Sequence, residues 1–451
     1  MKMRTIKTSN MKYSFVAFFF LVHLSLSAQS KVWTLQECVD YALENNITVK
    51  KGENNLLIND QDIIAAKGNF LPSLSTSLGE RVSIGSGFDP VSNQRISQTT
   101  NSFNYNISVN QNVFNGFRTL NLYKQSLLNQ EINKFDLNRI KDDISLNVAN
   151  AYLNVLFNKE NLETAKAQYD FSSKQLEQVS NLVDAGVQPK ANIFDAEATL
   201  SSDAQRLTVA DNNYTLSLLS LSQLLQIPFE GFRVEIIEVD TPSALLMYND
   251  IKPILNYAFE NRNEIKVAEK NIENAELNTQ ISKSGYYPSV NFSYGLGSVW
   301  SEAQNDFTKQ AFFRELDANK GHNFNLSVSI PVFSRFQNKT AVSKSKIREE
   351  NSKLDLDQAK LNLETNIQRA FTDAQAALKT FTAAQKSLES QELAFSNSQD
   401  RYNLGAMNSF DLEQARIRLI NAESSLINAK YDFVFKTKVL DFYLGKTITL
   451  D

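Results

Sequence analysis

The chain repeats its own sequence once, with the second copy starting near the middle. Residues 41–45 (YALEN) recur as 257–261 (YAFEN), and 71–73 (LPS) recur as 287–289 (YPS), both at an offset of 216. From 112–114 (NVF) and 331–333 (PVF) onward the offset is 219, and it still holds for the pairs Leu200/Leu419, Leu207/Leu426, Tyr214/Phe433 and Leu221/Leu440. A single short insertion in an otherwise constant offset indicates a tandem duplication. We therefore expect one continuous architecture built from two equivalent halves.

Residues 1–28 have the order of a secretory signal peptide. Four basic residues precede an apolar stretch at 13–26, and Ser27 and Ala28 supply the small residues of a cleavage site. The stretch is short of the about 20 apolar residues that span a bilayer. A retained signal anchor is the alternative. We predict export, with cleavage after Ala28.

Composition argues against several classes of function. Without residues 1–28 the chain keeps 42 basic and 50 acidic residues, a net charge of −8, and it has no Lys/Arg cluster. Nucleic-acid binding is therefore not expected. The single cysteine, Cys38, allows neither an internal disulfide nor a structural zinc site. No phosphate loop, nucleophile elbow or metal-ligand spacing occurs, and His322 is the only histidine after the signal peptide. We predict no catalysis, no metal and no cofactor.

Four segments, at 73–78, 103–110, 289–296 and 323–330, alternate between apolar and small polar side chains. This pattern puts the apolar side chains on one face of a strand. A soluble antiparallel sheet with one wet face is one interpretation. Export, a length near the about ten residues of a tilted membrane strand, and aromatic residues at the strand ends favour membrane strands. Those aromatic residues are Phe114, Phe117, Tyr286, Tyr287, Trp300, Phe333 and Phe336. Polar loops are expected at 85–101 and 301–322.

Four strands are too few to close a barrel. An open edge in hydrocarbon leaves backbone N–H and C=O groups unpaired, and the smallest closed barrels have about eight strands. If these strands span a membrane, several chains must share one barrel. A dimer would supply eight strands and a trimer twelve.

Two runs without glycine or proline predict very long helices. They cover 117–185 and 332–404, and each is followed by a short break, at 186–189 and at Gly405, and a second run of helical pattern. A helix of that length reaches about 100 Å, whereas the mean helix has about 11–12 residues. Each half should therefore contain a long helical hairpin.

Apolar residues recur every seven positions in all four long segments, which is typical of coiled coils. The first and third segments carry Val148, Val155, Leu162, Tyr169, Leu176 and Val183, and Ile367, Ala374, Phe381, Leu388, Phe395 and Tyr402. We interpret a further stripe, Ala370, Ala377 and Ala384, as a second seam that suits a helix with neighbours on both flanks. A simple antiparallel hairpin with one seam is the alternative.

These signals divide the chain into successive segments. They are a signal peptide (1–28), an N-terminal helical segment (29–70), a strand pair (71–115), a helical hairpin (116–226), an equatorial linker (227–251) with a short strand in 232–239, a second helical segment (252–286), a second strand pair (287–333), a second helical hairpin (334–445) and a tail (446–451). The predicted class is a mixed α and β membrane protein.

Three motifs, in this order within the duplication, resemble the TolC-like outer-membrane efflux and secretion channels. They are the start at 33–37 (WTLQE), residues 66–73 (AKGNFLPS), and residues 401–405 (RYNLG) followed by Asp411 and Ala415. The resemblance implies a homotrimer with a twelve-stranded barrel in outer-membrane lipid and a helical tunnel in the periplasm. It also implies a periplasmic adaptor, an inner-membrane pump, and export of small molecules or proteins by tripartite efflux or type I secretion.

The resemblance further implies a narrowed aperture at the helical tips. The family places acidic rings six and nine residues after the glycine of the second hairpin, which here are Asp411 and Gln414; Gln414 departs from the pattern. The same offsets from Gly186 give Asn192 and Asp195. The tip turns that would contact the adaptor include Gly186, Gly405, Tyr402 and Met407, and Met407 replaces an arginine found in some members. An N-cap or a surface carboxylate near a helix start is the alternative interpretation of Asp411.

A different class of protein also fits the pattern of long helices and strands. A secreted coiled-coil structural or adhesive protein with a soluble β-head would have the same elements. Such a head would mix charges into the strand faces, and these strands do not. We therefore favour the export channel.

Overall fold

The computed structural model describes residues 31–89, 93–237, 250–303 and 311–446, which fall into two compact units. The first unit takes the residues up to Lys50, Arg139–Arg262 and the residues from Leu363 on, and the second takes Lys51–Asn138 and Asn263–Asn362. The predicted signal peptide, residues 238–249 of the expected linker and most of the expected tail lie outside the described residues.

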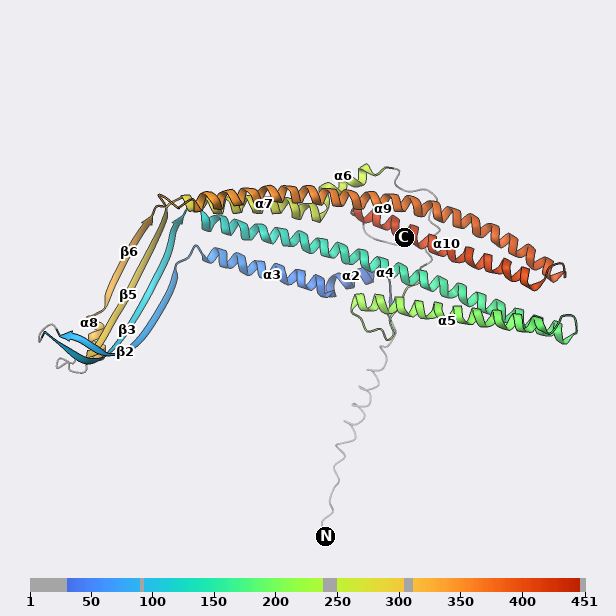
Figure 1. Cartoon of the computed structure of the whole chain (residues 1–451), viewed down its shortest axis with the longest axis horizontal. Helices are drawn as coiled ribbons and strands as arrows, with labels where there is room; N and C mark the ends of the chain where they lie inside the picture. Colours follow the sequence, from blue (N-terminus) through green and yellow to red (C-terminus); the bar gives the residue numbers. More distant parts are fainter. Residues whose placement is uncertain (1–30, 90–92, 238–249, 304–310, 447–451) are drawn as a thin grey trace, which may run out of the picture. The chain divides into compact units, whose positions relative to one another are not determined.

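Long helices occur in both halves of the chain (Figure 1). Helices α4 (Arg118–Asp184) and α9 (Gln337–Asn403) each have 67 residues, and α5 (Ala191–Leu225) and α10 (Ser409–Tyr443) each have 35. Their bounds follow the runs without glycine and proline. In the first unit α4 returns through a tight turn into α5, and α9 returns in the same way into α10. Within the described residues, no helix has an apolar stretch long enough to cross a membrane.

The predicted second seam on α9 is wrong. Ala377 and Ala384 are buried, but they share one core with Phe381 instead of facing another side. That core also contains Ala429 and Phe433 of α10. Residues three and four apart are neighbours on one face of a helix, so the two stripes form a single seam. In the described chain, α9 and α10 fit the alternative, an antiparallel hairpin with one seam.

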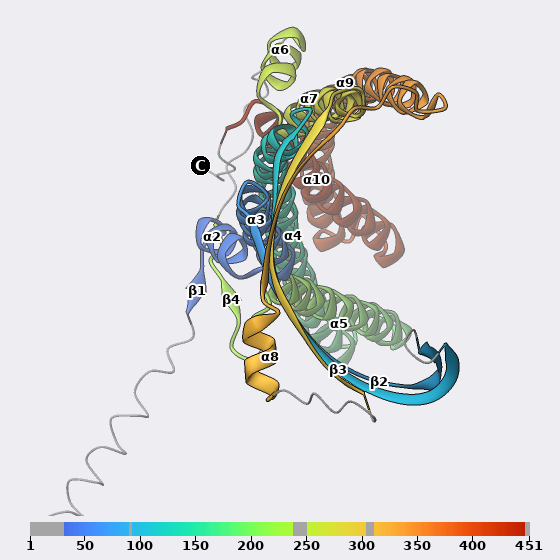
Figure 2. The ribbon, with the colours of Figure 1, turned by 90° about the vertical axis from the view of Figure 1, so that its left-hand side faces the viewer.

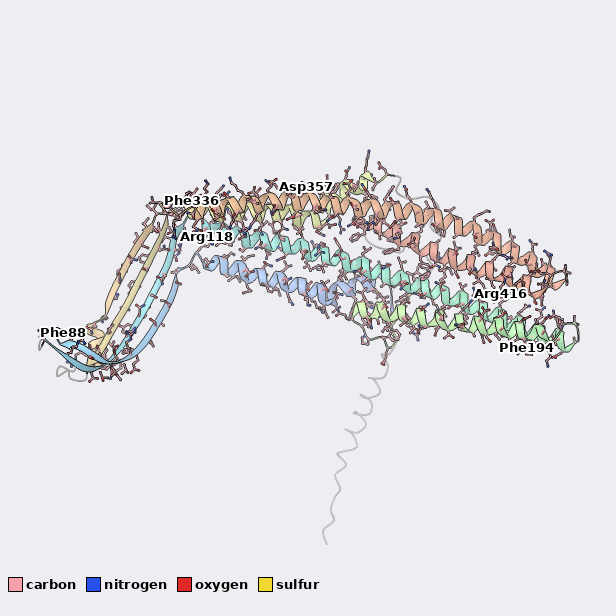
Figure 3. The ribbon with its side chains drawn as sticks, in the orientation of Figure 1. Phe88, Arg118, Phe194, Phe336, Asp357 and Arg416 are labelled. Carbon is pink, nitrogen blue, oxygen red and sulfur yellow. The ribbon has the colours of Figure 1, made fainter. Side chains whose placement is uncertain are left out.

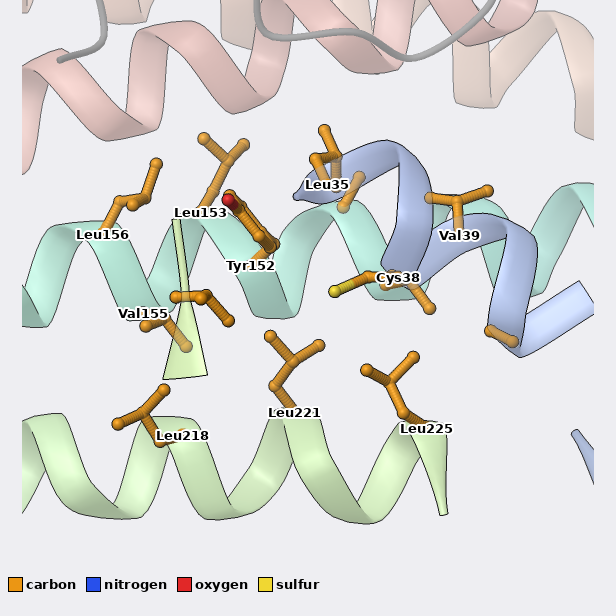
Figure 4. Close-up of a cluster of buried hydrophobic side chains, with 14 of the residues drawn as sticks. Leu35, Cys38, Val39, Tyr152, Leu153, Val155, Leu156, Leu218, Leu221 and Leu225 are labelled. Atoms are coloured by element: carbon orange, nitrogen blue, oxygen red, sulfur yellow. The ribbon is translucent and has the colours of Figure 1, made fainter. Parts of the chain in front are cut away.

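A buried cluster of the first unit forms where α2 (Leu35–Asn45) packs with α4 and α5 (Figure 4). Helix α2 begins with a capping box, in which the backbone N–H of Glu37 donates to Thr34 Oγ1 and that of Thr34 donates to the Glu37 carboxylate. Cys38 of α2 and Tyr152 of α4 are both fully buried there. Burial raises the pKa of the Cys38 thiol to about 12, so this side chain packs as a neutral group.

Two short strands join the chain on either side of this cluster. Strand β1 (Val32–Trp33) pairs in parallel with β4 (Arg233–Val234), and the hydroxyl of Tyr152 donates to the carbonyl of Glu235 at 2.7 Å. In the described part of the predicted linker strand, residues 232–237, the paired strand is limited to Arg233 and Val234. The hydrogen bond from Tyr152 attaches the segment after α5 to α4, and the strand pairing attaches it to the residues before α2.

Helix α6 (Lys252–Asn261) follows the linker and also belongs to the first unit. Arg262 directly after it is buried, with its guanidinium carbon 4.2 Å from the centroid of the Phe442 ring. An Arg262 nitrogen lies 3.5 Å from a carboxylate oxygen of Asp142. The start of the second half is thereby attached to α4 and α10.

The second unit contains a four-stranded antiparallel sheet with the order β2-β3-β5-β6. Its strands are β2 (Ser73–Asp89), β3 (Gln94–Asn115), β5 (Ser289–Ala303) and β6 (Gly321–Ser329). Most of helix α3 (Ile47–Gly68) precedes β2, and helix α7 (Asn263–Lys283) with a 3₁₀ turn (Ser284–Tyr286) precedes β5. The two strand pairs come from different halves of the duplication, and they meet along β3 and β5.

Three of the strands are longer than the predicted ten residues, and the expected polar loop at 85–101 is wrong. Strand β2 continues to Asp89 and β3 starts at Gln94, so most of that segment is paired strand. The sequence of this segment is rich in serine and threonine, which are common in loops. The hydrogen bonds of a sheet are made by the backbone, however, and do not need apolar side chains. In the second expected loop, β5 extends to Ala303 and a short helix, α8 (Phe312–Ala318), precedes β6.

One face of the sheet is apolar and exposed. Leu74, Val109, Tyr294 and Phe324 lie side by side across all four strands. Leu74 and Phe324, at the two ends of that row, are 72% and 70% exposed. The neighbouring row on the opposite face is wholly polar and consists of Ser73, Asn110, Ser293 and Asn325. The strict alternation in the sequence therefore becomes two chemically distinct faces.

Aromatic side chains gather at both ends of the apolar strand segments. At the ends next to the helices of this unit, the ring of Phe117 lies 5.2 Å from that of Phe114 and 6.3 Å from that of Tyr287, between centroids. At the other end, Trp300 lies 5.2 Å from Phe312 of α8. The sequence predicted aromatic residues at the strand ends: Phe117 contacts two others of the predicted set, whereas the partner of Trp300, Phe312, was not predicted.

Candidate functional site at the helical tips

Both long hairpins reverse direction at a glycine in a left-handed conformation. Gly186 has φ +70° and Gly405 has φ +72°. After α4 the N–H of Val187 donates to Leu182 O at 2.8 Å, and after α9 the N–H of Ala406 donates to Arg401 O at 2.8 Å. Together with the bonds from the two glycine N–H groups, these are Schellman motifs, whose left-handed residue is usually glycine because a side chain is strained in that conformation. The two turns occupy equivalent positions of the two halves of the duplication.

Asp411 lies in the first turn of α10 and is exposed. The N-cap is Asn408, whose Oδ1 accepts from the Asp411 N–H at 2.8 Å and whose Nδ2 donates to the Asp411 carboxylate at 3.0 Å. A carboxylate in this position is stabilised by the helix dipole. Asp411 is therefore not the N-cap itself but an exposed carboxylate fixed beside it.

A chain of side-chain hydrogen bonds joins the two hairpins near their turns. Asn192 Nδ2 donates to Gln188 Oε1 at 3.2 Å, and Gln188 Nε2 donates to the hydroxyl of Tyr402 at 3.4 Å. Asn192 and Gln188 belong to the first hairpin, and Tyr402 to the second. The sequence predicted roles for Asn192 and Tyr402, but it did not single out Gln188, which connects them.

A cavity of about 280 Å³ lies between the hairpins in the first unit. Asn192, Asp195 and Tyr402 line it, so three of the predicted site residues meet in one place. Asp411, Gln414, Met407 and the two glycines are not among its lining residues. The remaining walls are mainly apolar and aromatic, and include Phe171, Val179, Phe410 and Leu412.

The most buried charges of this region were not predicted from the sequence. Arg416 of α10 (Figure 3) and Asp203 of α5 form an ion pair of 2.7 Å, with 6% and 1% of their side chains exposed. Arg416 Nε also donates to Glu413 at 3.0 Å. Burial works to lower the pKa of Arg416, but the bonds to Glu413 and Asp203 outweigh burial and the pKa is raised. Arg416 is thus permanently charged and links the two hairpins.

One signal for this pair was present in the sequence. Arg416 follows the apolar position Leu412 by four residues, so it falls on the face that the heptad pattern assigns to the interior. The duplication hides the pairing, because at the offset between the two halves Asp203 corresponds to Ala422 and Arg416 corresponds to Glu197. The ion pair exists only because the two halves differ at these positions.

Large apolar side chains next to the turns are exposed. Val187 and Leu404, which flank the two glycines, are 69% and 84% exposed, and Phe194 (Figure 3) and Phe410 are 62% and 69% exposed. No described residue covers them. Exposed apolar groups gathered in this way are typical of contact surfaces.

Comparison with known proteins agrees with this architecture. Residues 38–225 and 254–446 match the family model described as outer membrane efflux protein. The chain is 22% identical over 435 residues to outer membrane protein TolC of Salmonella enteritidis, across 94% of this chain and 85% of that protein. It is 21% identical over 379 residues to the pyoverdine export outer membrane protein OpmQ of Pseudomonas aeruginosa, across 81% of this chain and 75% of that protein.

Among solved structures, a crystal structure of CusC superposes with a TM-score of 0.76 at 16% identity, covering 91% of this chain and 92% of that one. At this identity the likeness is one of fold. The family match covers the greater part of both halves, including both helical hairpins and their turns. The chain therefore belongs to the outer membrane efflux protein family.

Proposed function

We propose that this protein is a trimeric outer-membrane channel that exports small molecules or proteins together with a periplasmic adaptor and an inner-membrane pump. Three sheets combine into one twelve-stranded barrel in the outer membrane. The long helices of three chains surround a periplasmic tunnel. The chain performs no catalysis, and energy for transport comes from the pump.

The open sheet with its exposed apolar face carries this proposal. Among the described residues, β2 and β6 each have one strand partner only, so each leaves one edge of backbone groups unpaired. A row of large apolar side chains crosses the same sheet and is exposed. Contact with lipid would explain why apolar side chains are exposed on this face. Pairing with strands of other chains in a closed barrel would satisfy the backbone groups at the two edges. The number three comes from the family, since a dimer would also satisfy the edges.

The tips form the periplasmic entrance in this proposal. Asp411 and Asp195 are exposed carboxylates near the turns and would provide the acidic rings of the aperture, with Gln414 and Asn192 as their uncharged neighbours. The turns at Gly186 and Gly405, with Tyr402 and Met407, contact the adaptor. The exposed side chains of Val187 and Leu404 support this assignment, because they offer an apolar surface at both turns.

Ion conductance tests the proposed function. Purified protein added to a planar lipid bilayer should produce discrete conductance steps. The Leu326→Arg variant, which places a charge on the apolar face, should insert far less often, while Asn325→Arg on the opposite face should still form channels. A secreted protein with a soluble β-head would give no steps with any of the three proteins.

A further inference from the structure

Helix α8 lies against the apolar face of the sheet, on its convex side (Figure 2). The ring of Phe312 is 5.2 Å from that of Trp300 and 5.3 Å from that of Phe103, between centroids. The Ser298 hydroxyl donates to the carbonyl of Leu316 at 2.7 Å. Ser298 and Trp300 lie on the same face of β5 as Tyr294 and Leu296, and Phe103 is paired with Trp300 on that face. Helix α8 therefore covers part of the apolar face that is exposed elsewhere.

On the two strands that α8 contacts, the apolar positions of this face end at Phe103 of β3 and Trp300 of β5, which is the level of α8. Strand β6 begins at Gly321, opposite Gly297 of β5. Beyond this level β5 is contacted by α8 and by Asn319 directly after it: Ser298 Oγ donates to the carbonyl of Leu316, and Asn319 Nδ2 donates to the carbonyl of Val299. The part of β5 from Val290 to Trp300 is close in length to the about 9–11 residues with which a tilted strand spans a bilayer. In the proposed barrel, α8 therefore lies where the hydrocarbon layer ends.

The side of α8 that faces away from the sheet combines an aromatic and a basic side chain. Phe313 is 82% exposed, although its neighbour Phe312 packs against the sheet. Arg314 is exposed too, and it forms no ion pair with the part of the chain that the structure describes. Aromatic rings and basic side chains are the groups that favour the boundary between hydrocarbon and headgroups.

We propose that α8 is an interfacial lipid anchor, with Phe313 inserted among acyl chains and Arg314 at the phosphates of lipid headgroups. The inference rests on the proposed membrane location of the sheet. Lipid is favoured over a second copy of the chain because Phe312 packs on the apolar face of the sheet, over Phe103 of β3 and Trp300 of β5, and not in the plane in which strands pair. A neighbouring chain in a shared barrel joins at the edge strands β2 and β6.

Depth-dependent quenching tests the anchor. Cys38→Ser removes the only native thiol, and single cysteines are then introduced by Phe313→Cys, Leu326→Cys and Asn325→Cys and labelled with the fluorophore NBD. The proteins are reconstituted into phosphatidylcholine vesicles whose lipids carry a doxyl quencher either near the headgroup or near the chain end. We expect position 313 to lose more fluorescence with the shallow quencher, position 326 to lose more with the deep quencher, and position 325 to be quenched by neither.

The three positions separate the failure of the anchor from the failure of the proposed function. Quenching at 326 without quenching at 313 would overturn the anchor and leave the membrane sheet intact. Absence of quenching at both would overturn the membrane location itself. Adding Arg314→Gln to the Phe313→Cys protein should reduce the shallow quenching, because the helix loses its contact with the headgroups. Unchanged quenching would overturn the role of Arg314.

Discussion

Asp203 lies in α5 with 1% of its side chain exposed, and its charge is balanced mainly by Arg416 of α10. Arg206 is a weaker partner, because its nearest nitrogen lies 3.7 Å away and its side chain is 46% exposed. A buried carboxylate without a close partner is strongly unfavourable, whereas a pair of apolar side chains in the same place is tolerated. The Asp203–Arg416 ion pair therefore affects the stability of the contact between the two hairpins of one chain.

Removing one partner of this pair should destabilise the protein far more than removing both. Arg416→Met leaves Asp203 buried and should cost about 3–5 kcal/mol, and Asp203→Leu combined with Arg416→Met should recover most of the loss. Thermal unfolding followed by circular dichroism at the helical band measures the difference. Lys386→Met is the control, because its partner Glu389 and Lys386 itself are mostly exposed, and such pairs contribute little. A double variant no more stable than Arg416→Met would contradict the prediction.

At the scale of single residues, the sequence predicted the roles that depend only on neighbouring residues in the chain. Gly186 and Gly405 were identified as turns, and the structure gives both a positive φ that glycine adopts without strain. The Asp203–Arg416 contact was not identified, because it joins non-equivalent positions of the two halves. Gln188 was missed for a similar reason: its role depends on the tertiary approach of Tyr402.

At the scale of helices and strands, Glu423 of α10 lies in a partly buried position facing α4 and α9. Burial raises the pKa of Glu423 and the negative charge of Glu392 raises it further, while a hydrogen bond from Gln168 acts in the opposite direction. The unfolded chain releases this proton at a lower pH than the folded protein does. The contribution of Glu423 to stability is therefore present at acidic pH and is lost as pH rises through its raised pKa.

Glu423→Gln should raise the unfolding temperature at pH 8 and have little effect at about pH 3, where the glutamate is protonated in both states. Thermal unfolding of wild type and variant at the two values of pH measures this. Glu163→Gln is the control with the opposite sign, because the hydrogen bond from Lys159 lowers the pKa of Glu163. That variant should be slightly less stable than wild type at pH 8. A Glu423→Gln protein that is less stable than wild type at pH 8 would refute the assignment.

Each face of the sheet should tolerate charge differently. Leu326 stands opposite Phe292 on the apolar face, and Asn325 stands opposite Ser293 on the polar face. Leu326→Arg should cost about 2–4 kcal/mol at the bilayer midplane and reduce assembly, while Asn325→Arg should be tolerated. The amount of oligomer extracted from the membrane fraction and resolved by size-exclusion chromatography measures this. Equal tolerance of both changes would favour a soluble sheet.

The periodic signals predicted the elements well, and their errors have physical causes. Alternation at 73–78 and 103–110 identified β2 and β3, but polar residues beyond the apolar stretch concealed how far the hairpin extends, because strand pairing is made by the backbone. The heptads located the seam of α9, but the alanine stripe was assigned to a second side although it lies on the same face. Helix α8 was not predicted, since it is too short to show a period.

At the scale of the whole molecule, the exposed carboxylates Asp411 and Asp195 should control ion flow through the assembled channel. Carboxylates from several chains held around one axis attract cations and repel anions. We predict a cation-selective pore blocked by multivalent cations from the side of the helical tips. Asp411→Asn should weaken selectivity and block, and Asp195→Asn should add to the effect.

Reversal potentials in a salt gradient, with and without a multivalent cation, measure both properties in planar bilayers. Asp170→Asn, an exposed position on α4 before the turn, is the control and should leave both unchanged. If the double variant of Asp411 and Asp195 keeps the selectivity and the block of the wild type, the constriction is formed by other residues.

The number of chains in the assembly tests the proposed shared barrel, because in the described part of the sheet the edge strands β2 and β6 each have only one strand partner. Native mass spectrometry of the protein extracted from membranes in mild detergent gives this number without reference to activity. We predict a mass of three chains, with folded helices and no monomer in equilibrium with it. A folded, stable monomer would contradict the shared barrel, and with it the proposed channel.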